Sequence, residues 1–223
     1  MTRGSESNIR AGYAAGAGAF NAHFAACTGR PGHYRHGVRE FGSSSLSLAG
    51  ALLVAHPTLL DPNFRRSVLF LSTNDPQEGS FGLTLNRPAG RTVGELLADQ
   101  ALGQLAQVAV FVGGPVATDQ LIFASFKWHD ATNVLECRHH LVIDEAREAV
   151  HDDATIVRAF VGYAGWSQGQ LENELAQRAW LVQKPDPSVL ELERCPHLWR
   201  DLTSNFGPWY RLVAEAPEDL SNN

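Results

Sequence analysis

"VGYAGWSQGQLENELAQRAW", residues 161–180, is the stretch whose interpretation decides between two folds. Its residues 165–169, "GWSQG", match G-x-S-x-G, the motif in which a serine hydrolase presents its nucleophile on a sharp turn between a strand and a helix. A β-branched and aromatic run, residues 155–161, precedes the motif, and apolar residues recur every four positions after it. This pattern predicts strand, turn and helix. Ser167 is therefore either a catalytic nucleophile or the cap of a helix.

The hydrolase interpretation has partners in the chain order that α/β-hydrolases use. Asp186 and His197 follow Ser167, and Gly113-Gly114 could supply the amides of an oxyanion hole. The spacing argues against it, because the acid and the histidine of that fold sit on later strands of a long parallel sheet and only 56 residues follow Ser167. The capping interpretation needs fewer residues, since Ser167 as N-cap and Gln170 at N3 complete an S-x-x-Q capping box.

Charge divides the chain at about residue 45. Residues 1–45 contain five arginines and two glutamates, a net charge of +3, and are rich in Gly, Ala, Ser and His without an apolar period. That composition predicts a disordered or poorly structured tail. Residues 46–223 contain 13 basic and 22 acidic side chains, a net charge of −9, and predict a single folded domain.

Composition also narrows the class of partner. An acidic domain repels the phosphate backbone of DNA unless basic residues gather locally, and the densest basic stretch is Arg65-Arg66, so direct DNA binding is not expected. The chain has no run of about 18 apolar residues, which predicts no membrane span. Three scattered cysteines, Cys27, Cys137 and Cys195, argue against a disulfide framework and favour the cytoplasm.

Short strands arrive in groups along the chain, with helices between the groups. The expected strands cover residues 46–55, 67–72, 81–86, 108–112 and 121–126. A short polar loop between the second and third predicts an antiparallel hairpin. This order predicts an α+β fold with a mixed, largely antiparallel sheet, and leaves a doubly wound parallel sheet as the alternative.

Helix starts are marked by capping residues and prolines. Thr92 and Glu95 fit a capping box that begins a short helix, and Asp144 is expected to cap a helix of about two turns. The segments "PDPSVLEL" and "CPHLWRDL", near the C-terminus, have helical spacing and begin at proline-containing turns.

Two further chemistries can be weighed from spacing. Cys137-x-His139 and Cys195-x-His197 supply two thiols and two imidazoles, but structural zinc sites usually place two to four residues between paired ligands. Exposed strand residues explain both pairs better, so neither a metal nor a cofactor is expected. Residues 113–115, "GGP", follow a strand and could offer backbone amides to a phosphate, but the G-K-[ST] of a Walker loop is missing.

Four segments carry a family resemblance when they are taken together: "LLVAHPTLLDPNFRRSVLFL", "FGLTLNRP", "VFVGGPVATDQ" and "GYAGWSQGQLENEL". Their order and spacing resemble the YqgE/AlgH family, also called DUF179 or UPF0301, over about residues 46–215. The family pattern is G-W-x-x-G-Q-L-E, in which other small residues also occupy the position of Ser167. A nucleophile cannot be optional, so the resemblance implies that Ser167 is a cap.

The resemblance also implies a fold and a functional class. The family fold is α+β, with a barrel-like sheet and surrounding helices, and the family has no established activity. Its transcriptional-regulator label derives from an effect on alginate production. A helix-turn-helix with basic residues on its second helix, which would support that label, is not evident here.

Three strand ends, at residues 86–88, 113–115 and 165–166, are expected to converge on a ligand site. Arg87 would supply a planar cation, Gly113 and Gly114 free amides, and Trp166 an apolar face. The predicted ligand-binding residues are Asn86, Arg87, Gly113, Gly114, Trp166, Gln170 and Glu172. The residues assigned to the structural motif are Pro57, Asp61, Phe64, Ser67, Pro88, Pro115, Gly165, Ser167 and Gly169. The alternative is that the first group consists of turn and core residues, with Arg87 paired to Glu172 or Asp61.

These observations predict a cytoplasmic regulatory or ligand-binding protein whose partner is an unknown small molecule or protein. Catalytic residues are not assigned. The alternative is a small-molecule enzyme, either a serine hydrolase using Ser167 or an enzyme acting on a phosphate-bearing ligand. An enzyme should place at least two titratable groups within hydrogen-bond reach in one pocket, whereas a pocket of Asn, Gln, Gly and Trp groups favours binding.

Overall fold

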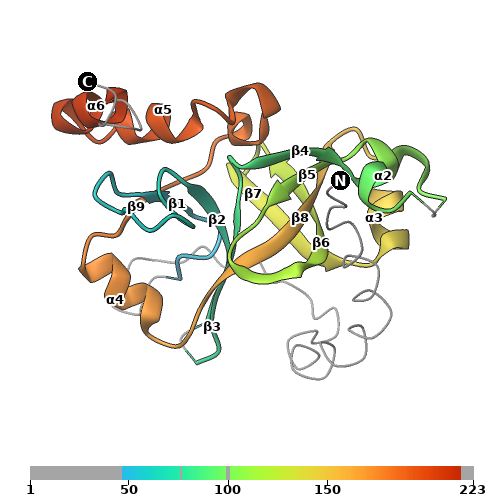
Figure 1. Cartoon of the computed structure of the whole chain (residues 1–223), viewed down its shortest axis with the longest axis horizontal. Helices are drawn as coiled ribbons and strands as arrows, with labels where there is room; N and C mark the ends of the chain where they lie inside the picture. The colour runs from blue at the N-terminus through green and yellow to red at the C-terminus, as the bar shows by residue number, and fades with distance from the viewer. Residues whose placement is uncertain (1–46, 76, 99–100, 217–223) are drawn as a thin grey trace, which may run out of the picture. The chain divides into compact units, whose positions relative to one another are not determined.

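The computed structural model describes residues 47–216 except 76 and 99–100, and these residues belong to one unit, Ser47–Asn223. The tail expected at residues 1–45 lies outside the described residues, so both that expectation and the single-domain boundary stay predictions. Within the described part, Figure 1 shows a curled sheet with helices packed around it.

Nine strands of the described residues form one sheet, ordered β4-β5-β8-β3-β2-β1-β9, with β6 also paired to β8 and β7 paired to β6. Seven of the eight strand pairings are antiparallel, and only β5 with β8 is parallel. The α+β prediction with a mixed, largely antiparallel sheet is confirmed, and the doubly wound alternative is wrong. The strands are β1 Leu52–Ala55, β2 Val68–Asp75, β3 Gly79–Thr84, β4 Pro88–Thr92, β5 Ala109–Val112, β6 Val116–His129, β7 Val134–Leu141, β8 Thr155–Trp166 and β9 Trp180–Gln183.

Five of the six strands expected from the sequence correspond to β1, β2, β3, β5 and β6, and the sixth, at residues 155–161, is part of β8. The hairpin of β2 with β3 is confirmed. β1 begins only at Leu52, and β6 extends far beyond the expected segment. β4, β7 and β9 were not predicted. β7 nevertheless alternates, with Leu135 and Leu141 buried and the residues between them partly or fully exposed, which is the period-2 signal of a half-buried strand.

β8 connects the two halves of the sheet. Residues 155–161 of this strand pair with β5 and β6, whereas residues 164–166 pair with β3. Gly162 lies between these two parts with a φ of 69°, a left-handed conformation that glycine adopts without a steric penalty. One strand therefore changes direction at Gly162 and serves both curved halves.

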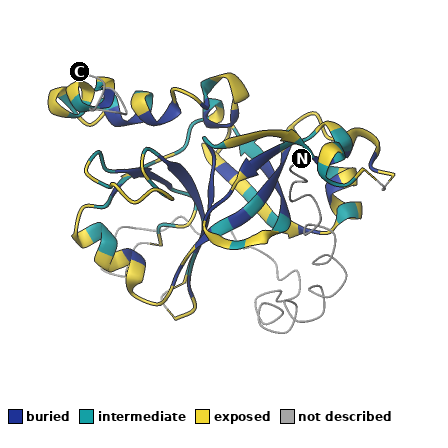
Figure 2. Ribbon diagram, in the orientation of Figure 1, coloured by how far each residue is buried: buried dark blue, intermediate teal, exposed yellow. Residues whose placement is uncertain are grey.

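Two clusters of buried apolar side chains form the core, and Figure 2 shows that the buried residues follow the strands. The larger cluster joins β1, β2 and β3 to Leu171 and Leu198 on two covering helices. The smaller cluster packs Val93 and Ala146, on two other helices, against β5, β6 and β8. Full burial of a Val, Leu or Phe side chain stabilises a fold by about 1.5–3 kcal/mol, so these contacts hold the helices on the sheet.

Five α-helices cover the sheet in the described residues: α2 Val93–Leu96, α3 Ile143–Ala149, α4 Gln170–Ala176, α5 Leu198–Ser204 and α6 Pro208–Glu215. The Thr92 start of α2 is confirmed, and the Thr92 amide donates to Glu95 Oε2 at 2.9 Å. The prediction that Asp144 caps α3 is wrong by two residues: Val142 is the N-cap, and its amide donates to Glu145 Oε2.

Near the C-terminus, "CPHLWRDL" becomes helical from Leu198 onward, as α5. "PDPSVLEL" instead forms two 3-10 turns, Pro187–Leu190 and Leu192–Arg194. The first of these turns is started by Asp186, whose carboxylate accepts from the Ser188 amide at 2.9 Å. This segment is therefore helical only over short 3-10 turns, and the longer helix that its spacing predicted does not form.

The stretch at residues 161–180 has the predicted order of strand, turn and helix, but its cap differs. β8 continues through Trp166, and α4 begins at Gln170 with Gly169 as N-cap at a φ of 74°. Ser167 is exposed, and both its amide and its hydroxyl donate to Gln170 Oε1 at 3.1 Å. The assignment of Ser167 as N-cap is wrong, because its hydroxyl bonds a side chain rather than an amide of the first turn.

This geometry separates two neighbouring substitutions. Gly169→Ala is expected to lower the free energy of unfolding by about 1 kcal/mol, because alanine is strained in the left-handed conformation. Ser167→Ala should change it by less than about 0.5 kcal/mol, as is usual for an exposed side chain. Urea unfolding of both variants tests the assignment, and a larger loss for Ser167→Ala would restore the serine as the cap.

Candidate functional site

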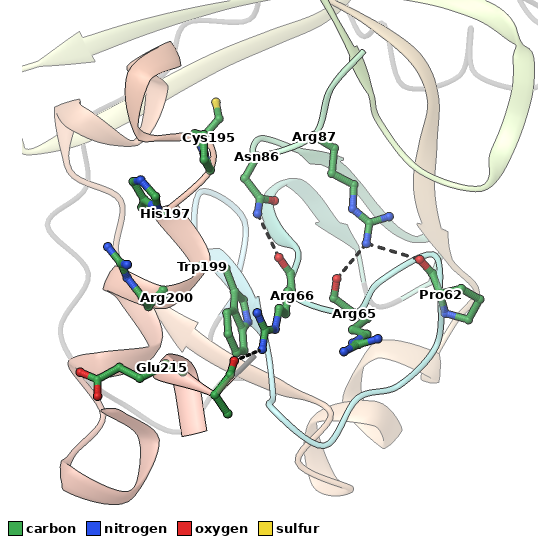
Figure 3. A pocket seen from close by; sticks show the side chains of 13 residues that line it. Pro62, Arg65, Arg66, Asn86, Arg87, Cys195, His197, Trp199, Arg200 and Glu215 are labelled. Atoms are coloured by element: carbon green, nitrogen blue, oxygen red, sulfur yellow. Dashed lines mark hydrogen bonds between the residues drawn. The ribbon is translucent and has the colours of Figure 1, made fainter. Parts of the chain in front are cut away.

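A pocket of about 740 Å³ lies between two loops of the sheet and the C-terminal helices α5 and α6 (Figure 3). Thirteen residues line it, and they come from residues 62–66 before β2, residues 86–87 between β3 and β4, and residues 195–216 around the two helices. The fold thus brings together segments that are far apart in the sequence.

The lining of the pocket is strongly basic. Four arginines line it, while Glu215 is the single carboxylate among the thirteen lining residues. The arginines are Arg65, Arg66, Arg87 and Arg200. Because residues 46–223 carry a net charge of −9, from 13 basic and 22 acidic side chains, this local excess of positive charge opposes the sign of the chain around it.

Arg87 is held in the pocket wall by backbone carbonyl groups. Its Nη1 donates to Asn63 O at 2.5 Å, and its Nη2 donates to Arg65 O at 2.9 Å and to Pro62 O at 3.5 Å. Burial lowers the pKa of Arg87, and the nearby charge of Asp61 opposes that shift. Arg87 is therefore a partly desolvated cation whose hydrogen-bond partners are uncharged.

Asn86 and the loop before β2 position this arginine. The Asn86 side chain accepts from the Val68 amide at 2.8 Å and donates to Arg66 O at 2.9 Å, which extends the pairing of β2 with β3 by one step. In the loop, the Asp61 carboxylate accepts from the Asn63 amide at 2.8 Å, and the hydroxyl of buried Ser67 donates to a carbonyl at 2.7 Å. These bonds turn the loop carbonyls toward Arg87.

Arg66 links the loop to the two C-terminal helices. Its Nη2 donates to Ala216 O at 2.6 Å, just beyond α6, and its guanidinium carbon lies 5.0 Å from the centre of the Trp199 ring. Trp199 is itself fixed, because its indole N–H donates to Ala55 O at the end of β1. The helical wall of the pocket is thus attached to the sheet at two points.

Arg158, which is only 2% exposed, shares the acceptor Leu85 O with the pocket-lining Cys195. Its Nη1 donates to Leu85 O at 3.0 Å and its Nη2 to Leu190 O at 2.6 Å, while the guanidinium lies 4.2 Å from the centre of the Phe111 ring. Burial lowers the pKa of Arg158 to about 10. Burial also raises the pKa of Cys195, so this pocket-lining cysteine stays a thiol. Sequence reasoning missed Arg158, whose one signal was a charge inside an apolar strand.

Of the seven predicted ligand-binding residues, only Asn86 and Arg87 line this pocket. Gly113 and Gly114 instead pack against β8: a Cβ on Gly113 would meet Gly162 O, and one on Gly114 would meet the backbone of Tyr163. The glycines therefore allow the chain between β5 and β6 to pass close to β8. The structure does not join the three strand ends in this pocket, and ligand binding by the other five residues stays a prediction.

The candidate hydrolase residues make separate contacts. The Ser167 hydroxyl donates to Gln170, and the Asp186 carboxylate accepts from the amide and hydroxyl of Ser188. His197 lines the pocket at the start of α5. Among the hydrogen bonds of the described residues, none joins Ser167, Asp186 and His197 to one another, so the geometry gives the nucleophile no base.

The two Cys-x-His pairs also separate. Cys137 and His139 lie on β7, as strand residues, but they are partly buried rather than exposed. Burial raises the pKa of Cys137 to about 12, which disfavours the thiolate that binds metals. Cys195 is buried and precedes α5, so the strand interpretation of the second pair is wrong. The part of the chain that the structure describes contains no group of three or more potential metal ligands.

His139 gives a pH-dependent prediction. Burial and the neighbouring His140 lower the pKa of His139 to about 4, and its ring stacks on Phe81 with centroids 4.5 Å apart. Since the unfolded value is near 6.5, the unfolded chain binds a proton first as pH falls. The stabilising effect of neutral His139 is therefore complete above about pH 6.5 and is lost as pH falls towards 4.

His139→Phe should retain the stacking and flatten that pH dependence. The free energy of unfolding, measured with urea at about pH 7 and about pH 5, should fall less in the variant than in the parent protein. Part of the pH dependence of the free energy of unfolding should persist in the variant, because burial also lowers the pKa of His140. An unchanged slope would show that His139 is readily protonated in the folded protein.

Comparison with known proteins shows the family to which this chain belongs. The family model described as DUF179, AlgH-like, matches residues 52–211. The chain belongs to the AlgH-like family. This confirms the resemblance carried by the four segments.

Relatives support the same assignment. The chain is 35% identical to a UPF0301 protein of Streptomyces coelicolor, over 79% of this chain and 96% of the relative. It is 37% identical to a UPF0301 protein of Thermobifida fusca, over 80% and 96% respectively. The solution structure of the AlgH protein from Pseudomonas aeruginosa matches with a TM-score of 0.54 and 27% identity, over 81% of this chain and all of that one. A crystal structure from Corynebacterium diphtheriae matches in fold, with a TM-score of 0.60, 21% identity and coverage of 75% and 92%.

In this AlgH-like chain, Trp166 and Gln170 of the G-W-x-x-G-Q-L-E segment form, together with Trp180, a clamp around Glu174, a residue that sequence reasoning missed. The indole N–H groups of Trp166 and Trp180 donate to Glu174 Oε2 at 2.9 and 2.8 Å, and Gln170 Nε2 donates to its Oε1 at 3.0 Å. Both indoles are nearly buried, at 5% and 4% exposed. Glu172 is exposed and lies 3.5 Å from an Asn74 amide nitrogen. Trp166 is thus a core residue of this AlgH-like protein.

Phe64 connects the two tryptophans around Glu174 to the pocket of the AlgH-like chain. Phe64 stacks on Trp166, with ring centroids 6.4 Å apart, and contacts Trp180 edge to face at 5.4 Å. Phe64 belongs to the loop whose carbonyls bind Arg87.

In the described residues, no helix is long and apolar enough to cross a membrane.

Proposed function

We propose that this AlgH-like protein is a non-catalytic binding protein whose arginine-lined pocket takes a small anionic ligand. The observation that carries the proposal is the gathering of four arginines, with one carboxylate, around a pocket of about 740 Å³. Pockets for small molecules usually measure about 300–1,000 Å³. Size and charge therefore both suit an organic anion.

Arg87 gives this pocket a preorganised cation. Its guanidinium is fixed by carbonyls and partly removed from water, as the direction of its pKa shift indicates. A cation in such surroundings attracts an anion more strongly than the same cation in bulk solvent. Arg200, on α5, adds an exposed guanidinium from the opposite wall.

Binding is favoured over catalysis by the state of the other lining groups. Cys195 has a raised pKa and donates to backbone carbonyls, which does not suit a nucleophile. Among the hydrogen bonds of the described residues, none connects His197 to Cys195 or to Glu215. A regulatory role would follow if the anion reports on cell state, and the free thiols Cys137 and Cys195 support the cytoplasm as its location.

Citrate and inorganic phosphate test this proposal, with binding measured by isothermal titration calorimetry on the full chain at two salt concentrations. At least one of the two anions should bind, and more weakly in high salt. Arg200→Gln should weaken the binding about tenfold, the usual effect of losing a hydrogen bond to a charged group.

Arg147→Gln is the matched control for Arg200→Gln. Arg200 and Arg147 are helical arginines with side chains 48% and 46% exposed, and each is ion-paired with a nearby aspartate, but only Arg200 lines the pocket. The control should bind as the parent protein does. An equal loss in both variants would mean that the anion responds to overall charge, which would contradict a specific pocket. If neither citrate nor inorganic phosphate binds, and ADP titrated in the same way does not bind either, the proposed function is wrong.

A further inference from the structure

We infer that the anion taken by this pocket is an organic phosphate of nucleotide size, whose phosphate is held by arginines and whose uncharged part fills the remaining volume beside the two lining prolines. This inference rests on the proposed function and names the chemical class of the ligand.

The cations lie on two walls of the pocket. Figure 3 shows Arg200 on the α5 side, and Arg87 and Arg65 on the loop side, with Arg66 between them. A ligand with more than one negative charge, or with several acceptor oxygens on one group, can contact arginines of both walls at once. Glu215, the last residue of α6, repels an anion, but the four arginines outnumber this single lining carboxylate.

Phosphate fits these donors better than a lone carboxylate does. A phosphate monoester carries about 1.5–2 negative charges near neutral pH and presents three strong acceptor oxygens. A guanidinium group presents its N–H donors as a planar fork that matches such oxygens in pairs. Guanidinium groups from two walls can therefore share one phosphate or a pair of linked phosphates.

The rest of the pocket suits an uncharged organic part. Among the apolar lining residues, Pro62 and Pro196 are exposed, whereas Trp199 and Ala214 are only 5% and 4% exposed and add little surface. A volume of about 740 Å³ greatly exceeds what one inorganic phosphate fills. An organic body placed against this surface removes apolar area from water, which adds affinity that an inorganic ion does not gain. Nucleotide-sized phosphates combine both features.

Calorimetric titration of the full chain with four probes tests the inference: ADP, adenosine, inorganic phosphate and citrate. ADP should bind about tenfold or more tightly than each of the other three, because it alone combines phosphates with an organic body. Arg200→Gln should weaken ADP binding about tenfold and leave any residual adenosine binding unchanged, whereas Arg147→Gln should change neither. Thermal melts of both variants check that they remain folded.

The outcomes separate the inference from the function on which it rests. If inorganic phosphate or citrate binds as tightly as ADP, with loss in Arg200→Gln, the pocket is an anion site but the organic-phosphate inference is wrong. If adenosine binds as tightly as ADP, the phosphate is not recognised and the inference is equally wrong. If none of the four probes binds, both the inference and the proposed function fail.

Discussion

Arg158→Met is expected to lower the free energy of unfolding by about 2–4 kcal/mol, among the largest effects of any single substitution in this protein. The side chain is 2% exposed and supplies the donors for Leu85 O and Leu190 O. Methionine fills a similar volume but donates no hydrogen bond. A buried acceptor left unsatisfied costs about 1–3 kcal/mol, as expected for Leu190 O, while Leu85 O keeps only the long contact from Cys195 Sγ at 3.6 Å. Removal of a desolvated charge offsets part of this cost.

The loss should also be felt at the pocket. Leu190 ends the 3-10 turn that precedes Cys195 and α5, so its bond to Arg158 ties this wall of the pocket to the sheet. Arg147→Met, at an exposed helical site, should change stability by no more than about 0.5 kcal/mol. Urea unfolding of both variants decides the point. A stability of Arg158→Met equal to that of the parent would show that its two carbonyls find other donors.

Glu174→Ala is expected to lower the free energy of unfolding by about 2–4 kcal/mol, because it leaves two nearly buried indole N–H groups without their acceptor. The carboxylate accepts from Trp166 and Trp180 through one oxygen and from Gln170 through the other. Indole nitrogen can only donate, so neither tryptophan can compensate by changing its hydrogen-bonding role.

Glu172→Ala provides the matched control, since it removes the same type of side chain from the same helix. Glu172 is exposed and has one weak contact, with Asn74 at 3.5 Å, so its loss should cost less than about 0.5 kcal/mol. Glu174→Gln keeps an acceptor oxygen and should lie between the two alanine variants. Tryptophan fluorescence during urea unfolding measures the free energy of unfolding of each variant. Equal losses for Glu174→Ala and Glu172→Ala would show that Glu174 does not hold the two indoles.

Local patterns in the sequence determined much of the secondary structure. The polar loop before β3 predicted a hairpin, and Thr92 with Glu95 predicted the start of α2. These signals worked because each depends on residues within a few positions of one another. The order of four short segments was also sufficient to indicate the family, since it is a property of the chain itself.

Boundaries were harder to predict, for a physical reason seen at residues 161–180. Sequence spacing made Ser167 the cap, whereas β8 continues through Trp166 because residues 164–166 pair with β3. That pairing joins segments far apart in the chain, and it moves the N-cap of α4 to Gly169. A tertiary contact thus overrides a capping box that is plausible by itself.

The sequence by itself determined the class of fold, the family, and Asn86 and Arg87 as two residues of the pocket wall. Only the tertiary structure decided that Arg66 and Arg200 join them, because α5 returns to the sheet more than half the chain length after the loop before β2. It also decided that the glycine pair serves close packing and that Arg158 and Glu174 are buried hydrogen-bond centres. The reason is physical: these roles depend on which carbonyl, indole or strand lies opposite a residue, and local sequence does not contain that partner.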